Sequence, residues 1–256
     1  MEFKDIIKDI KYKHSNVADR LSTDLIYIRE ELKTNEKKTI DNFLNSFYNS
    51  RIGIRILIGQ FISNCEENDG LFKPCYPYSI LKTAIEDIQL IAEDIFDSSF
   101  NICVHGCNKN SIDNPKNIIS DYNFLYIPSF VYYIFFEILK NSVAATYHNN
   151  KNNIDVYMSE GIDDVIVKIS DTGGGMKKDE LPKIFSYCYS NKKKTDILHS
   201  LKMNRFVLSG YGHGLPLSKL YAQYFGGDIQ MITFNGIGTD TIIYLNKLLD
   251  NQEKKI

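Results

Sequence analysis

The chain lacks several features that would assign it at once to a common class of protein. No apolar run is long enough to span a bilayer, and a formal net charge of −2 gives no general attraction to nucleic acid or to a membrane surface. The first residues form neither the apolar core of a signal peptide nor an Arg-rich, acid-poor transit segment. No internal repeat is present. We therefore expect a globular protein without a membrane span or a nucleic-acid partner, and 256 residues can bury one large core or two moderate ones.

Cysteine is scarce and scattered. The cysteines at 65, 75, 103, 107 and 188 are odd in number and irregularly spaced, which favours reduced thiols over a disulfide framework. Cys103, His105 and Cys107 have the spacing C-x-H-x-C. No second cluster of ligands accompanies them, so we expect no metal at this place.

Three glycines alternate in the segment GYGHGLP, which is the most informative stretch of the chain. Gly210, Gly212 and Gly214 lead into a predicted helix over residues 215–225, with Pro216 in its first turn. Glycine permits positive φ and a close approach of the backbone. A helix N-terminus behind such a lead offers N–H groups and a positive dipole end to phosphate. Taken alone, the pattern fits a plain glycine turn equally well.

A second motif lies on a predicted helix over residues 128–147, where apolar side chains recur at helical spacing. Glu137 and Asn141 are four residues apart and therefore share a face. A carboxylate can accept a proton or orient water, and an amide oxygen can ligate Mg²⁺. The alternative is a solvated helix face, although Tyr133 and Ala144, which lie near it, are not typical of one.

The third and fourth motifs follow predicted strands. Asp171 ends an alternating strand and precedes Gly173 and Gly175, which leave room for a flat ligand. The Asp171 carboxylate can accept a hydrogen bond from an exocyclic amine, or it can simply cap a glycine-rich turn. The segment GIGTDT then leads into a final strand, and its Thr239 serves either a nucleotide or the turn.

The period of the apolar residues divides the chain into two parts, and together they predict an α+β fold. Up to residue 99 the pattern is mostly helical, with helices over 39–61 and 79–96, Ser79 as the candidate N-cap of the latter, and a loop over 64–78 between them. Strands are then expected at 101–104, 123–127, 154–159, 164–170, 228–233 and 239–245. The Asn-, Ser- and Lys-rich insert at 106–121 is predicted to be a loop.

The order E-x-x-x-N, D-x-G-x-G, G-x-G-x-G and G-T resembles that of the GHKL ATP-binding fold of gyrase, Hsp90, histidine kinases and MutL. Longer segments are similar to the mitochondrial 2-oxoacid dehydrogenase kinases, the pyruvate and branched-chain enzymes. They are FFEILKNSVAAT, IFSYCYS, GYGHGLPLSKLYAQYFGGD and GIGTDTIIYL. FLNSFYNSRIGIRILIGQF and KHSNV resemble parts of that family's N-terminal helical bundle.

This resemblance implies a partial helical bundle over residues 1–99, lacking its first part, and a GHKL, or Bergerat-type, α/β sandwich with a mixed sheet over 100–256. It implies ATP and Mg²⁺ as cofactors, with Asn141 as the metal ligand and Glu137 as the general base. The residues implied to contact ATP are Asn141, Ala144, Asp171, Gly173, Gly175, Met176, Ser190, Asn191, Gly210, Tyr211, Gly212, His213, Gly214, Leu215 and Thr239. The lysine-bearing segment 191–209 corresponds to the ATP lid; it is either a solvated loop or a source of cations for the triphosphate.

The implied activity is phosphorylation of a serine on the E1α subunit of a 2-oxoacid dehydrogenase complex, which inactivates that complex. The resemblance also implies a homodimer in the mitochondrial matrix. The family's C-terminal Asp-Trp pair, used in contacts with the E2 lipoyl domain, has no counterpart, because the chain contains no Trp. Tyr133, Ala144 and Thr172 stand where the family carries His, Arg and Arg.

Three other functions remain open at this point. A nucleotide-binding regulator without kinase activity would be compatible with Tyr133 and Ala144. A histidine kinase would need a phosphoacceptor, for which His14 is the only candidate in the helical part. An ATPase of the Hsp90 or MutL type would use Glu137 with water as the nucleophile.

Overall fold

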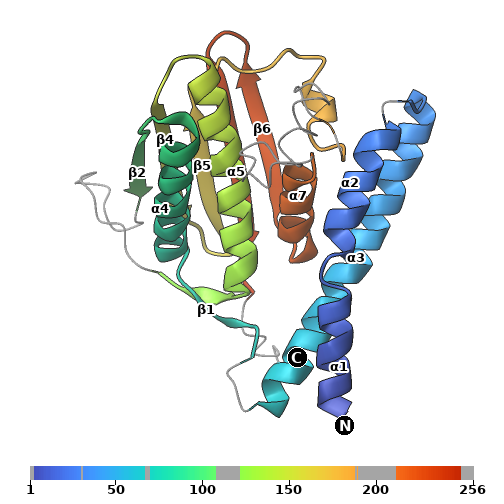
Figure 1. Cartoon of the computed structure of the whole chain (residues 1–256). Coiled ribbons are helices and arrows are strands. Elements are labelled where there is room, and N and C mark those ends of the chain that lie inside the picture. Colours follow the sequence, from blue (N-terminus) through green and yellow to red (C-terminus); the bar gives the residue numbers. More distant parts are fainter. Residues whose placement is uncertain are drawn as a thin grey trace, which may run out of the picture.

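A computed structural model describes residues 3–29, 31–66, 70–107, 122–187, 189 and 212–248. Three helices form an elongated N-terminal unit, and the remaining helices cover one face of a sheet (Figure 1). Among the sites predicted above, Ser190, Asn191, Gly210, Tyr211 and the segment 191–209 lie outside the described residues.

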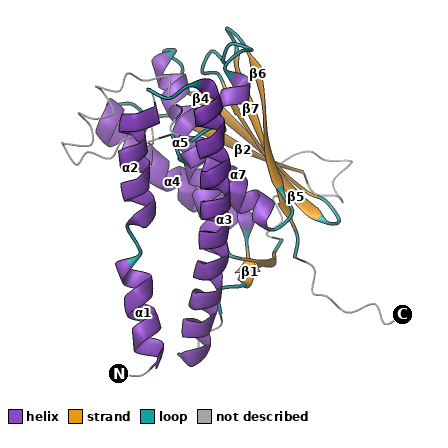
Figure 2. Cartoon of the chain, turned by 90° about the vertical axis from the view of Figure 1, so that its right-hand side faces the viewer, coloured by secondary structure: helices purple, strands orange, loops and turns teal. Residues whose placement is uncertain are grey.

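The N-terminal unit is built on the long helix α3 (Thr34–Cys65), with α1 (Phe3–Lys13) and α2 (Val17–Arg29) following one another along its length (Figures 1 and 2). The rings of Phe3 and Phe61 meet edge to face with centroids 5.5 Å apart. The Arg51 guanidinium donates hydrogen bonds to the carbonyls of His14, at 2.7 Å, and Ser15, at 3.1 Å, and so ties the α1–α2 turn to α3. The helix predicted over 39–61 is confirmed as part of α3.

The main sheet has five strands in the order β2-β4-β5-β7-β6. Their bounds are β2 (Asn101–Cys107), β4 (Asn153–Glu160), β5 (Asp164–Asp171), β6 (Asp228–Phe234) and β7 (Gly238–Asn246). The β2–β4 pair is parallel and the other pairs are antiparallel, which confirms the predicted mixed sheet. Side chains alternate as the period predicts, and Val165, Val167 and Ile169 are fully buried.

In the part of the chain that the structure describes, three helices cover the buried face of this sheet: α4 (Pro77–Phe96), α5 (Pro128–His148) and α7 (Gly214–Tyr224) (Figure 1). A short 3₁₀ helix, η1 (Leu181–Lys183), follows β5 in the chain. The central helix α5 contributes most to the core, through fully buried Val131, Ile134, Phe135 and Leu139. Helix α4 packs in the same core, and the hydroxyl of Tyr132 on α5 donates to Asp87 on α4 at 2.6 Å. The domain boundary at residue 99 stays a prediction.

Two local predictions about the region before α4 were wrong. The N-cap of α4 is Tyr76 rather than Ser79, and Pro77 occupies the first turn because its fixed φ suits that place. Residues expected to form a loop include β1 (Lys73–Cys75), which pairs antiparallel with β3 (Phe124–Tyr126) in a separate two-stranded sheet.

The strand β2 also runs further than predicted, through Gly106 to Cys107.

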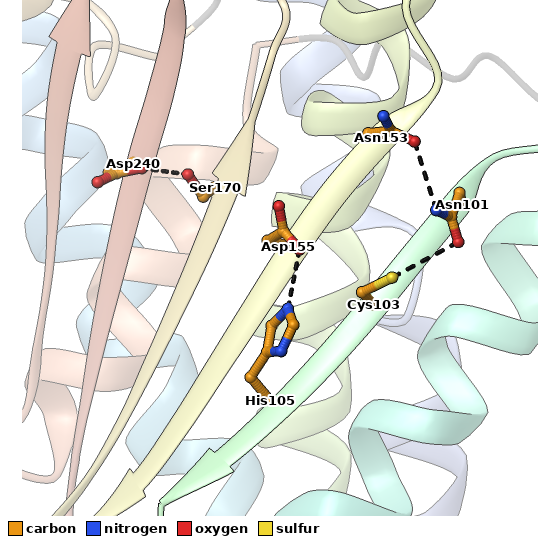
Figure 3. A network of polar contacts seen from close by, with 7 residues as sticks. All are labelled: Asn101, Cys103, His105, Asn153, Asp155, Ser170 and Asp240. Carbon is orange, nitrogen blue, oxygen red and sulfur yellow. Dashed lines mark hydrogen bonds and ion pairs between the residues drawn. The ribbon is translucent and has the colours of Figure 1, made fainter. Parts of the chain in front are cut away.

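The other face of the sheet carries polar side chains (Figure 3). The His105 ring bonds the Asp155 carboxylate at 2.8 Å, and Cys103 donates to Asn101 at 3.5 Å. Within the described residues, no group of three or more His, Cys, Asp or Glu is arranged to hold a metal ion. The helices that the structure describes include none that is both long and apolar enough to cross a membrane.

Candidate nucleotide site

The middle of α5 carries a buried ion pair. The Glu137 residue is 8% exposed and Lys140 is 5% exposed, and Lys140 Nζ lies 2.5 Å from Glu137 Oε1. Removing a lone charge from water is costly, so the two groups compensate each other and hold the carboxylate in one orientation. The alternative of a solvated helix face is therefore wrong for Glu137. Sequence reasoning missed Lys140, although its i+3 spacing from Glu137 was a usable signal.

The N-terminus of α7 lies directly against this carboxylate. A Cβ atom added to Gly214 would lie 2.0 Å from Glu137 Oε2, so only glycine permits the observed approach. His213 is the N-cap of α7 and Gly212 has a φ of 72°. The helix begins at Gly214, one residue earlier than predicted, and Leu215 lies in its first turn. The first-turn N–H groups and the positive dipole end thus lie beside Glu137.

The turn after β5 lies beside the other half of α5. The buried Asp171 carboxylate accepts hydrogen bonds from the backbone N–H groups of Gly173, at 2.9 Å, and Thr239, at 3.2 Å. Burial raises the pKa of Asp171, and these hydrogen bonds, together with one from the Ser142 side chain, act in the opposite direction. The carboxylate therefore does cap its turn, as the simpler reading of the sequence had it.

The glycines of this turn are required by close packing. A Cβ added to Gly173 would lie 2.5 Å from the Cβ of Ala145 on α5. Gly175 has a φ of 67°, and its added Cβ would lie 2.2 Å from the carbonyl oxygen of Phe234. The Met176 N–H donates to the Thr233 hydroxyl at 2.7 Å. The turn is thereby held between α5 and the end of β6.

One face of α5 therefore connects the predicted site residues that the structure describes. Glu137 touches α7 and Ala145 touches the Asp171 turn, and the two positions are eight residues apart, about 12 Å along the helix. Asn141 lies between them and is half-buried, while Ala144 is buried in the next turn. Thr239 is buried opposite Asp171 across the β5–β7 pair. The described site residues therefore lie along α5 between the start of α7 and the Asp171 turn.

The fold and this site define the class of the protein. Residues 127–249 match the family of histidine kinase-, DNA gyrase B- and HSP90-like ATPases. Residues 1–76 match the mitochondrial branched-chain alpha-ketoacid dehydrogenase kinase family.

Curated relatives define the family more closely. The chain is 33% identical to the mitochondrial [pyruvate dehydrogenase (acetyl-transferring)] kinase of Arabidopsis thaliana, over 98% of this chain and 70% of the relative. It is 34% identical to the kinase of that name from Schizosaccharomyces pombe, over 98% and 60% of the two chains, and 29% identical to human isozyme 1, over 96% and 59%. The chain belongs to the mitochondrial 2-oxoacid dehydrogenase kinase family, within the GHKL superfamily, and it spans about three fifths of the length of the latter two relatives.

The positive φ of Gly212 leads to a first prediction. Gly212→Ala is expected to weaken Mg-ATP binding about tenfold or more, the equivalent of about 1.4 kcal/mol. Alanine is strained at the φ of 72° that Gly212 adopts, and relief of this strain would move the backbone that precedes α7. The matched control is Gly226→Ala, which has a similar φ of 82° beyond the opposite end of α7. Both variants should lose similar melting temperature. If calorimetry shows that both variants lose the same affinity for Mg-ATP, Gly212 serves only the structure of its turn.

Proposed function

We propose that this chain is an ATP-dependent protein serine kinase that phosphorylates, and thereby inactivates, the E1α subunit of a 2-oxoacid dehydrogenase complex. The observation that carries the proposal is the contact between the Glu137 carboxylate and the N-terminus of α7. The contact supports the proposal because a carboxylate can accept a proton and a helix N-terminus suits a bound phosphate. The family membership supports the same activity, since the relatives described above are named as kinases of pyruvate dehydrogenase.

In the proposed reaction, Glu137 accepts the proton of the substrate serine hydroxyl as its oxygen attacks the γ-phosphorus of ATP. Lys140 holds Oε1, so the carboxylate keeps its orientation, and Oε2 lies toward α7. The first-turn N–H groups of α7, together with Gly210, Tyr211, Gly212 and His213, bind the phosphates. Catalysis then rests on positioning and on stabilisation of the developing charge.

At the other end of the site, the adenine lies against the Asp171 turn. Its exocyclic amine donates a hydrogen bond to the Asp171 carboxylate, and Gly173, Gly175 and Met176 border the ring, with Thr239 beside the carboxylate. Support comes from the buried position of Asp171 and from its pKa, which burial raises, since an amine donor compensates a buried carboxylate. Ala144 borders the nucleotide from α5, and Ser190 and Asn191 begin the segment proposed to cover it.

Asn141 is the proposed ligand of Mg²⁺. Its amide oxygen suits this hard cation, and it lies half-buried one helical turn after Glu137, between the two ends of the site. Bound Mg²⁺ would neutralise charge on the phosphates. The metal would complete its coordination with phosphate oxygens and waters, because Mg²⁺ sites commonly use few protein ligands.

Asn141→Ala is therefore expected to remove most of the Mg²⁺-dependent part of ATP affinity. Calorimetric titration of ATP with and without Mg²⁺, in wild type and variant, measures that part directly. Asn149→Ala is a suitable control. Asn149 is the C-cap of α5, and its side-chain amide donates to the Gly173 carbonyl at 2.6 Å, so it is not a proposed metal ligand. Equal Mg²⁺ dependence in wild type and Asn141→Ala would remove Asn141 from the metal site.

We also propose a homodimer in the mitochondrial matrix that acts on E1α. Binding of the E2 lipoyl domain is a further proposal. A nucleotide-binding regulator is the second candidate function. Tyr133, whose ring packs edge-on against Tyr221 at 5.2 Å where the family's His is implied, is compatible with a regulator. The relatives, which are named as kinases, do not favour it.

The test is the fate of the γ-phosphate. Labelled Mg-ATP is incubated with the chain and, separately, with the E1α subunit of pyruvate dehydrogenase and of the branched-chain enzyme. Acid-stable label on one E1α supports the kinase and identifies its substrate. Acid-labile label on the chain itself supports a histidine kinase, label in free phosphate alone supports an ATPase, and nucleotide binding without turnover supports the regulator.

A further inference from the structure

The N-terminal unit contacts the nucleotide site through a small aromatic cluster, which we call the α3 junction: Asp41, Asn45, Tyr48, Tyr187 and His213. Tyr187 is fully buried, and its backbone N–H donates to the Asp41 carboxylate at 3.1 Å. Its hydroxyl donates to the Asn45 side-chain oxygen at 2.9 Å. Its ring stacks on that of Tyr48 with centroids 5.4 Å apart.

His213 is the member of the junction that belongs to the nucleotide site. It is 6% exposed, and its ring meets those of Tyr187 at 5.3 Å and Tyr48 at 6.0 Å between centroids. It is also the N-cap of α7, and the next residue, Gly214, lies against Glu137. A continuous line of contacts therefore runs from α3, through Tyr187 and His213, to the proposed base.

Tyr187 makes hydrogen bonds that are not needed to fill the space its ring occupies. A phenylalanine would fill the same space, whereas a buried hydroxyl gains from folding only when it finds a partner of good geometry. Asn45 and Asp41, both on α3, bond the side chain and the backbone of Tyr187. Two bonds to one helix fix the ring in position and angle, and the ring in turn limits where His213 can lie.

We propose that Tyr187 is a positioning residue through which α3 sets the N-terminus of α7 against Glu137. The helical N-terminal unit then contributes to nucleotide affinity without touching the nucleotide. The inference rests on the proposed function only in that the nucleotide binds at the start of α7. It does not depend on phosphate transfer to E1α.

The test is a double-mutant cycle with Tyr187→Phe and Asn45→Ala in the full chain. Each single variant is expected to weaken Mg-ATP binding about 3- to 10-fold, and the double variant should be no weaker than the worse single, because both remove the same bond. Exchange of the Leu217 amide, whose N–H donates to the His213 carbonyl at 3.0 Å at the start of α7, should also accelerate in each variant, with no nucleotide present. This second measurement keeps the proposal testable even if no nucleotide binds, an outcome that would contradict the proposed function.

The matched control is Tyr132→Phe. It removes a tyrosine hydroxyl that bonds Asp87 at 2.6 Å between α5 and α4, on the side of α5 away from α7. The control should lose comparable melting temperature but should leave Mg-ATP affinity and α7 exchange unchanged. If Tyr187→Phe alters α7 exchange no more than Tyr132→Phe does, the positioning role is contradicted.

Discussion

Glu137→Gln is expected to lower phosphate transfer to the E1α serine by roughly 10²–10⁴-fold, the usual contribution of a positioned base. Mg-ATP affinity should stay within a few-fold of wild type. Glutamine keeps the shape of the side chain, and its amide oxygen can still accept a hydrogen bond from Lys140, so the buried ammonium is not left without a partner. Rates are measured at saturating E1α, and affinity is measured by calorimetry on the same preparations.

Stability must be measured beside the rate, because removing one member of a buried ion pair commonly costs about 3–5 kcal/mol. Glu137→Ala serves as the comparison: it removes both the base and the partner of Lys140, and should lower the melting temperature more than Glu137→Gln does. A Glu137→Gln variant that retains full transfer would exclude Glu137 as the base. Loss of ATP binding in parallel with loss of transfer would point to a binding role instead.

Gly214→Ala is expected to lower transfer by more than about 10²-fold, the loss that a misplacement of roughly 1 Å can cause. The added Cβ would lie 2.0 Å from Glu137 Oε2, so either the carboxylate or the start of α7 must move. Alanine itself favours a helix, by about 1 kcal/mol relative to glycine, so the melting temperature should change little. Loss of function with a stable fold is therefore the expected result.

The cause can be isolated by changing the residue that the methyl group would meet. In a Glu137→Ala background, Gly214→Ala should no longer weaken Mg-ATP binding, because the carboxylate is gone. In the wild-type background the same change should weaken it measurably. Equal effects in both backgrounds would show that the contact with Glu137 is not the reason for glycine at this position.

The sequence was most informative where local periodicity determines structure. The helical spacing of apolar residues in α5 and the alternation in β5 predicted both elements to within about a residue, because each has one face in a common core. Glu137 could be assigned to a shared face with Asn141 for the same reason. The family's motifs then indicated the order of the site along the chain, and the family itself is confirmed.

Long-range contacts could not be predicted in this way. The strand β1 forms only because β3, about 50 residues later, offers a partner. Lys140 gains its importance from burial that a helix pattern alone does not specify, and Tyr187 meets α3 across more than 140 residues. The roles of the individual site residues stay predictions, as do those of Ser190, Asn191, Gly210 and Tyr211, which lie outside the described residues.

Phosphate transfer to a serine through Glu137 is the activity that we propose for this chain. The most direct measurement is a single turnover of γ-labelled Mg-ATP with E1α, followed by mapping of the acid-stable phosphate and assay of dehydrogenase activity. We expect phosphoserine on E1α and a loss of dehydrogenase activity that keeps pace with its appearance. With Glu137→Gln we expect neither change. Bound ATP that yields no phosphoserine on any E1α, or a yield that Glu137→Gln leaves unchanged, would contradict the proposed activity.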